Sequence, residues 1–67
     1  MQQTTADDTR LWTLAETAEY LSLSRSALYR WRLTGEGPTG IRVGSVVRYR
    51  PSTVKAWVEE QEAQDRH

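Results

Sequence analysis

Two short helical patterns separated by a tight turn, within residues 13–33, constrain the fold more than any other feature of the chain. Thr13 and Glu16 have the spacing of a capping box, in which each side chain satisfies a backbone donor of the first helical turn. Apolar residues follow at helical spacing: Leu14, Ala18 and Leu21. The pattern therefore predicts a helix that begins after Thr13 and buries one face, followed by a turn at Ser22 and Leu23.

A second helix is predicted to begin after Ser24, whose hydroxyl can accept a hydrogen bond from a backbone N–H of the first turn. Leu28 and Trp31 lie on one face of this helix and should pack against the first helix. Three glycines and a proline within residues 34–40 end it at about Leu33. The expected unit is a helix-turn-helix.

The face of the second helix opposite Leu28 and Trp31 is basic. It carries Arg25, Ser26, Tyr29, Arg30 and Arg32. Like charges three to four residues apart repel one another, so this arrangement does not stabilise the helix itself. An ordinary solvated face would intersperse glutamates, yet no acidic residue occurs between Ser22 and Gly35. The pattern favours an anionic counterpart, and we expect this helix to enter a groove of double-stranded DNA.

Charge is segregated along the chain, although the formal net charge is zero. Residues 22–58 carry a net charge of about +6, whereas residues 1–21 and 59–67 each carry about −3. A basic middle between acidic ends is the distribution expected of a nucleic-acid-binding protein whose ends limit binding to other polyanions.

Sixty-seven residues without cysteine predict one small domain that has neither disulfides nor a cysteine-based zinc site. Three tryptophans, one in each predicted segment, are expected to supply much of the core: Trp12, Trp31 and Trp57. Catalysis is not expected, because the single histidine is the terminal His67 and no nucleophile, base or metal-ligand cluster can be named. We therefore expect no catalytic residue, no cofactor and no bound metal.

Residues 41–50 alternate with a period of two and are rich in β-branched side chains, which predicts a β hairpin. A three-residue loop at residues 44–46 would place the apolar residues of both strands on one face: Ile41, Val43, Val47 and Tyr49. Arg42 and Arg48 would then lie opposite each other on the outer face, where phosphate contacts explain them better than folding does. The hairpin is expected to be a wing with four candidate DNA contacts: Arg42, Ser45, Arg48 and Arg50.

Pro51 closes the second strand, and Ser52 is predicted to cap a last helix. Its buried stripe is expected to hold Val54, Trp57 and Val58. Apolar periodicity is then lost, so we expect a folded domain over residues 11–62, with flexible tails at 1–10 and 63–67.

The order helix, turn, helix, wing, helix resembles small winged helix-turn-helix proteins related to MerR-type DNA-binding domains, in particular phage and plasmid excisionases. Five stretches carry the resemblance: Leu-Trp-Thr-Leu-Ala-Glu-Thr-Ala-Glu-Tyr-Leu at 11–21, Leu-Ser-Arg-Ser-Ala-Leu-Tyr-Arg-Trp at 23–31, Ile-Arg-Val-Gly at 41–44, Val-Arg-Tyr at 47–49 and Val-Lys-Ala-Trp-Val at 54–58. It implies a mainly helical α+β fold in which the helix from Arg25 to Leu33 enters the major groove. The wing would approach the adjacent minor groove or backbone.

The resemblance also implies a function. An excisionase, or recombination directionality factor, binds and bends attachment-site DNA and directs an integrase towards excision. MerR-type regulators usually append a coiled coil and an effector domain, for which the ten residues after Trp57 are too few. The implied partners are double-stranded DNA, an integrase and further copies of the chain bound cooperatively on DNA. Residues 59–65 are either a surface for such a protein partner or a solvated helix end.

Two other functions stay open. A small transcriptional regulator of a mobile element would share every DNA-contact residue. A protein-interaction adaptor would use the basic face for an acidic partner, and a steep salt dependence of binding to duplex DNA would argue against it. No apolar run approaches the length of a membrane span and the amino terminus lacks the features of a secretion signal, so a cytoplasmic protein is expected.

Overall fold

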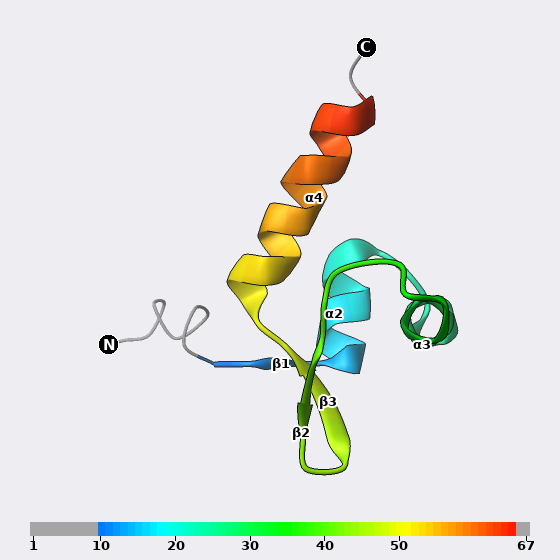
Figure 1. Cartoon of the computed structure of the whole chain (residues 1–67), viewed down its shortest axis with the longest axis vertical. Coiled ribbons are helices and arrows are strands. Elements are labelled where there is room, and N and C mark those ends of the chain that lie inside the picture. Colours follow the sequence, from blue (N-terminus) through cyan, green and yellow to red (C-terminus); the bar gives the residue numbers. More distant parts are fainter. Residues whose placement is uncertain (1–9, 66–67) are drawn as a thin grey trace.

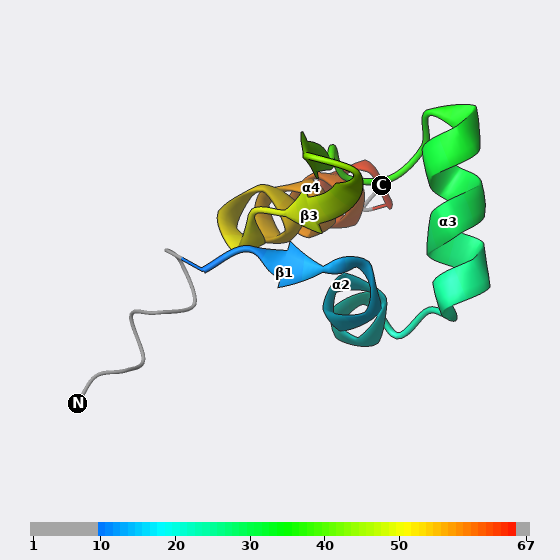
Figure 2. The ribbon, with the colours of Figure 1, turned by 90° about the horizontal axis from the view of Figure 1, so that it is seen from below.

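Over residues 10–65, the part of the chain that the computed structural model describes, three helices accompany a three-stranded antiparallel sheet (Figures 1 and 2). In chain order the elements are β1 (Trp12–Thr13), α2 (Leu14–Leu21), α3 (Arg25–Thr34), β2 (Ile41–Val43), β3 (Val46–Tyr49) and α4 (Pro51–Asp65). The mainly helical α+β fold of a winged helix-turn-helix is confirmed. The expected N-terminal tail, apart from Arg10, and the last two residues lie outside the described residues.

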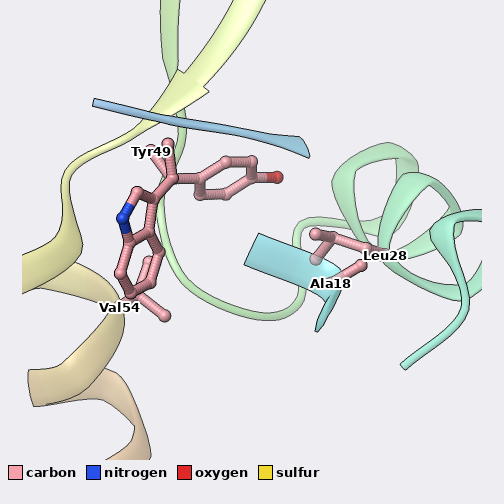
Figure 3. Packing of buried hydrophobic residues seen from close by; sticks show 5 residues of the cluster. Ala18, Leu28, Tyr49 and Val54 are labelled. Carbon is pink, nitrogen blue, oxygen red and sulfur yellow. The ribbon is translucent and has the colours of Figure 1, made fainter. Parts of the chain in front are cut away.

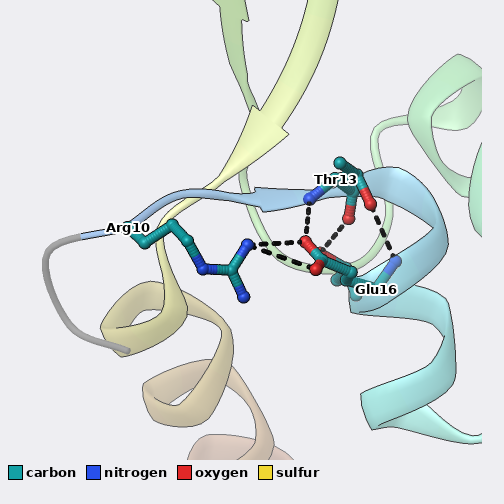
Figure 4. Close-up of polar contacts among 4 residues, drawn as sticks. Arg10, Thr13 and Glu16 are labelled. Carbon is teal, nitrogen blue, oxygen red and sulfur yellow. Dashed lines mark hydrogen bonds and ion pairs between the residues drawn. The ribbon is translucent and has the colours of Figure 1, made fainter. Parts of the chain in front are cut away.

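Helix α2 begins where the capping box predicts. Thr13 Oγ1 accepts a hydrogen bond from the Glu16 N–H at 3.0 Å, and Glu16 Oε1 accepts one from the Thr13 N–H at 2.9 Å (Figure 4). Arg10 Nη1 lies 3.2 Å from both carboxylate oxygens of Glu16. The hydrogen bond from the Thr13 backbone, aided by Arg10, holds the pKa of Glu16 below its usual value. Two hydrogen bonds and an ion pair thus define the start of α2.

The turn between α2 and α3 and both ends of α3 also follow the sequence signals. Ser22 adopts the left-handed conformation with φ 60°, which ends α2. Ser24 Oγ accepts a hydrogen bond from the Ala27 N–H at 3.1 Å and so caps α3. Gly35, with φ 82°, ends α3 after Thr34, one residue beyond the predicted end. The helix-turn-helix prediction is therefore confirmed.

The turn of the hairpin is shorter than predicted. Gly44 and Ser45 form a two-residue turn, and Val43 pairs with Val46, so the predicted three-residue loop is wrong. Gly44 has φ 64°, whereas φ of Ser45 is negative, because Ser22 is the one described non-glycine residue with a positive φ. A positive φ at the first turn position and a negative φ at the second is the pattern of a type II′ turn, which suits the twist of a two-residue hairpin.

The shorter turn changes which residues share a face of the sheet. Cross-strand partners lie on the same face. Arg42 pairs with Val47, and Arg48 pairs with Ile41. The prediction that Arg42 and Arg48 lie opposite each other is therefore wrong, because the two arginines lie on different faces of the hairpin.

The predicted apolar face of the hairpin is divided for the same reason. Val47 and Tyr49 pack towards the core, whereas Ile41 and Val43 are exposed. A Cβ on Gly40 would lie 3.2 Å from Val47 Cγ1 and 3.3 Å from Tyr49 Cε2, so Gly40, and not Ile41, occupies the inward position. A half-buried glycine just before β2 thus lies where the apolar pattern predicted the branched side chain of Ile41.

A third strand, β1, was not predicted. Trp12 pairs with Tyr49, and Thr13 pairs with Arg48, both antiparallel. A strand of two residues is too short to show a period of two in the sequence. Trp12 is buried and packs against Tyr20 of α2, with ring centroids 5.1 Å apart. Strand β1 thereby ties the start of α2 to the wing.

The core gathers residues from β1, β3 and all three helices (Figure 3). Its buried apolar members are Trp12, Ala18, Leu28, Tyr49 and Val54. Residues that pack against them from the margin are Leu14, Leu21, Trp31 and Val47. Trp31 and Trp57 are only partly buried, and their ring centroids lie 5.5 Å apart. The two tryptophans therefore join α3 to α4 at the edge of the core.

Helix α4 begins two residues earlier than the predicted cap at Ser52 implies. Pro51 is its first residue, so Ser52 lies inside the first turn and is not the N-cap, which corrects the prediction. Proline favours the first helical position because its φ suits a helix and it has no N–H to satisfy. The Arg50 carbonyl accepts the Val54 N–H at 3.1 Å. The helix continues to Asp65, beyond the domain boundary expected at residue 62, through residues that are good helix formers.

Candidate nucleic-acid interface

Helix α3 is held through one face. Leu28 is 1% exposed in the core. Trp31 packs between Trp57 and the backbone of Gly37, where a Cβ would lie 2.5 Å from Trp31 Cε3. With φ 79° and this close approach, position 37 requires glycine. The other side chains of α3 are exposed or half-buried. Figure 2 shows the helix at one side of the molecule, apart from α4.

The outward surface of α3 carries two stripes of side chains at helical spacing. The stripe beside the wing holds Arg25, Tyr29 and Arg32. The outer stripe holds Ser26, Arg30 and Leu33. All six residues are exposed except Arg32, which is half-buried. The five predicted α3 contacts are thus distributed over two adjoining surfaces of the helix.

A groove of about 420 Å³ separates the stripe beside the wing from strand β3. It is lined by that stripe, by residues 46–48 of β3 and by residues 13–15 at the start of α2. A Cβ on Gly40 would lie 3.0 Å from Arg32 Nη1, so the Arg32 guanidinium reaches across to the start of β2. Three arginines, at positions 25, 32 and 48, therefore surround a groove between the helix and the wing.

The four predicted wing residues take different positions. Arg48 lines the groove, is half-buried, and its Nη1 donates a hydrogen bond to the Val47 carbonyl at 2.9 Å. Arg42 is exposed on the face that Val47 shares, and Ser45 is exposed in the turn. Arg50 is exposed at the opposite end of β3, directly before α4. The structure brings Arg48 together with α3 and sets Arg50 apart from the groove.

No arginine of α3 or the wing forms an ion pair with a carboxylate of the described residues. Within residues 10–65 the one ion pair joins Arg10 to Glu16, at a distance from α3 and the wing in the sequence. Helix α4, which carries all four acidic side chains that follow residue 50, extends away from the wing (Figure 1). A positive surface without carboxylate partners attracts a polyanion, and its field is strongest where charges surround a groove.

Sequence reasoning missed some of the residues on this surface. Leu33 is 71% exposed on the outer stripe, and its spacing from Ser26 and Arg30 is a signal that could have identified it. Val46 was assigned to a loop because the hairpin register was wrong, yet it lines the groove as part of β3. The contribution of residues 13–15 had no signal in the sequence, because it depends on the packing of α2 against the sheet.

The described residues hold no group of three or more histidine, cysteine, aspartate or glutamate side chains that could bind a metal ion. Histidine and cysteine do not occur between residues 10 and 65. In the same part of the chain, every helix is too short or too polar to traverse a lipid bilayer.

Comparison with known proteins agrees with this geometry. The model of a family described as a helix-turn-helix domain matches residues 13–62, which include α2, α3, the wing and most of α4. No curated protein matches the sequence. The matched family includes excisionase-like DNA-binding proteins, and its fold supports sequence-specific binding of DNA. The match covers more than half of the chain, and the chain therefore belongs to the helix-turn-helix domain family.

Proposed function

We propose that the protein is an excisionase that binds specific double-stranded DNA sites, bends them, and directs an integrase towards excision. The observation that carries the proposal is the groove between α3 and β3, around which three arginines converge without a carboxylate partner in the described residues. The excisionase role is supported by the resemblance of residues 11–61 and by a matched family that includes excisionase-like proteins.

In this proposal helix α3 lies in the major groove. Arg30 and Ser26 on the outer stripe contact base edges, since an exposed guanidinium can donate two hydrogen bonds to O6 and N7 of guanine. Arg25 and Arg32 flank the wing and contact phosphates, which set the register of the helix on the duplex. Tyr29 lies between the base-contacting pair, Ser26 and Arg30, and the phosphate-contacting pair, Arg25 and Arg32. Its ring lines the groove between α3 and β3, and its hydroxyl contacts a phosphate or a base.

The wing contributes phosphate contacts. Arg42 and Ser45 are exposed along the hairpin and can follow the backbone next to the groove that α3 occupies. Arg48 is oriented by its bond to a backbone carbonyl and keeps other N–H donors for a phosphate. Arg50 lies apart from the other three, so its contact would be to a phosphate farther along the duplex. Contacts of this kind add affinity that is largely independent of base sequence.

The end of α4 offers a second surface for a protein partner. Its acidic residues are Glu59, Glu60, Glu62 and Asp65, and all four are exposed. Helix α4 points away from the wing, so this surface stays accessible when the basic surface is covered by DNA (Figure 1). We assign it to the integrase or to a neighbouring copy, whose basic middle segment is of complementary charge.

Selection from a pool of random duplexes at near-physiological salt tests DNA binding and the excisionase role together. Tandem direct repeats among the enriched sequences would support cooperative binding by several copies. An isolated palindrome would favour a dimeric transcriptional regulator, and an absence of enrichment would favour the adaptor. Arg30→Ala should reduce enrichment, whereas Lys55→Ala, which removes the same charge from an exposed site on α4, should change it little.

Bending distinguishes the excisionase from a simple regulator on the same selected site. Circularly permuted duplexes that carry the site at different distances from their ends should show position-dependent electrophoretic mobility when the protein is bound. Mobility that is independent of the position of the site would contradict the architectural role, while leaving sequence-specific binding intact.

A further inference from the structure

Leu33 is the most exposed of the large apolar side chains in the described residues, at 71%. It lies on the outer stripe of α3, one turn after Tyr29, which is itself 58% exposed. Ser26 and Arg30 belong to the outer stripe as well, whereas Arg32 belongs to the stripe beside the wing. An apolar ridge formed by Tyr29 and Leu33 thus runs through the middle of the basic surface of the helix.

The fold gives Leu33 no structural role. It belongs neither to the buried core nor to the residues that pack against it. The end of α3 is completed by backbone bonds, since the N–H groups of Gly35 and Glu36 both reach the Trp31 carbonyl. Leucine favours helix formation, but so do lysine, arginine and glutamate, which would be better solvated at this position. The side chain of Leu33 is therefore available for an apolar contact outside the chain.

We propose that Leu33, supported by the ring of Tyr29, contacts the 5-methyl group of a thymine in the major groove. This inference rests on the proposed binding of α3 to DNA. Thymine is the one base that presents an apolar group in the major groove, where the other features are hydrogen-bond donors and acceptors. Arginine and serine can read the donors and acceptors but cannot bury a methyl group.

The basic surroundings commit the ridge to DNA in preference to a protein. Arg30 and Arg32 both precede Leu33 within one helical turn, and neither makes an ion pair within residues 10–65. A duplex held by these arginines would bring base edges, and not an apolar protein surface, against the ridge. Leu33 would then confer the preference for thymine at one or two positions of the site, and Arg30 would confer the preference for guanine at another position.

Replacing thymine by deoxyuridine removes the methyl group alone and leaves base pairing unchanged. On the selected duplex, each thymine is replaced in turn, and the affinity of the full chain is measured by fluorescence anisotropy. At one or two positions the affinity should fall about three- to five-fold, the factor that corresponds to one buried methyl group. For Leu33→Ala the thymine and deoxyuridine duplexes should bind equally at those positions, whereas Leu33→Met should keep part of the difference.

Two results would overturn the inference while leaving the proposed function intact. The first is a deoxyuridine effect that is the same in wild type and Leu33→Ala at every position, and the second is no effect at any thymine. Failure to enrich any duplex would overturn both proposals together. Equal melting temperatures of the wild type and both variants, expected for so exposed a residue, ensure that a change in affinity reflects contact and not unfolding.

Discussion

Helices α2 and α3 have similar lengths but nearly opposite surfaces. Helix α2 buries Thr17 and Ala18, and its start is fixed by a complete capping box and an ion pair. Helix α3 fully buries Leu28 alone and turns three arginines outward. Under the proposed function, α2 contributes mainly to stability and α3 mainly to DNA binding, so substitutions in the two helices should separate these two properties.

The largest effect on stability is expected at Leu28, the one fully buried residue of α3. Leu28→Ala should lower the free energy of unfolding by about 2–5 kcal/mol, because it leaves a cavity in the core. That is comparable to the total stability of so small a domain. Chemical denaturation followed by circular dichroism measures the loss. A neighbouring exposed substitution, Leu33→Ala, is the control, and equal stability of the two variants would contradict the assignment of faces.

Arginines on the exposed side of α3 should affect binding without affecting stability. Arg30→Ala is expected to lose about 1–3 kcal/mol of binding free energy on the preferred duplex and to relax its sequence preference, because a base contact is removed. Arg42→Ala in the wing should weaken binding to all duplexes similarly. Competition between specific and random duplexes measures both variants. If Arg30→Ala weakens both duplexes equally, Arg30 does not read a base.

The caps of the two helices provide a matched comparison. Thr13→Ala removes the N-cap of α2 and one half of its capping box, and should cost about 1 kcal/mol of stability. Ser24→Ala removes one hydrogen bond at the start of α3 and should cost less. Thermal unfolding of both variants tests the order. A larger loss for Ser24→Ala would reverse the view that α2 is the more stabilising helix.

Tyr49 tests the interface between the two helices. Its ring points towards Ala18 and Leu28 (Figure 3), and its buried hydroxyl has no hydrogen-bond partner within the described residues. Because an unsatisfied buried hydroxyl is costly, Tyr49→Phe should raise the free energy of unfolding by about 1 kcal/mol. Tyr20→Phe, at a ring that is 46% exposed, should leave stability unchanged. Destabilisation by Tyr49→Phe would mean that the hydroxyl is hydrogen-bonded.

The smallest effect should be a dependence of stability on pH that arises from α2. The pKa of Glu16 is lower in the folded chain than its ordinary value of 4.5, because the Thr13 backbone and Arg10 favour the carboxylate. The stabilisation by Glu16 is therefore present above about pH 4.5 and is lost as the pH falls through the folded-state pKa. Glu16→Gln should flatten the decline in melting temperature on acidification. A decline identical to that of the wild type would exclude this contribution.

Features that depend on neighbours in the sequence were predicted well, whereas features that depend on contacts between distant segments were not. Thr13, Ser24 and the breakers after Thr34 act within one turn of the chain, so local sequence determined the ends of α2 and α3. The hairpin register depended on Gly40 fitting against Tyr49, a contact that no alternation pattern contains. Strand β1 likewise exists only because β3 is there to pair with it.

The site divides in the same way. The outward direction of the α3 arginines follows from helical spacing and was predictable. The convergence of Arg25, Arg32 and Arg48 on one groove was not, because it requires the position of β3 relative to α3. The predicted N-cap of α4 was wrong. Ser52 has the side chain that N-caps prefer, but the helix begins at Pro51, because proline also favours the first helical position.

Sequence-specific DNA binding by α3 and the wing is tested by the salt dependence of binding to the selected duplex and to a scrambled duplex of equal length. If about five to six phosphates are neutralised by α3 and the wing, the logarithm of the association constant should fall against the logarithm of salt concentration with a slope of about −5. The selected duplex should bind more tightly at every salt concentration. A shallow slope, or equal affinity for the two duplexes, would contradict a sequence-specific DNA-binding surface on α3 and the wing.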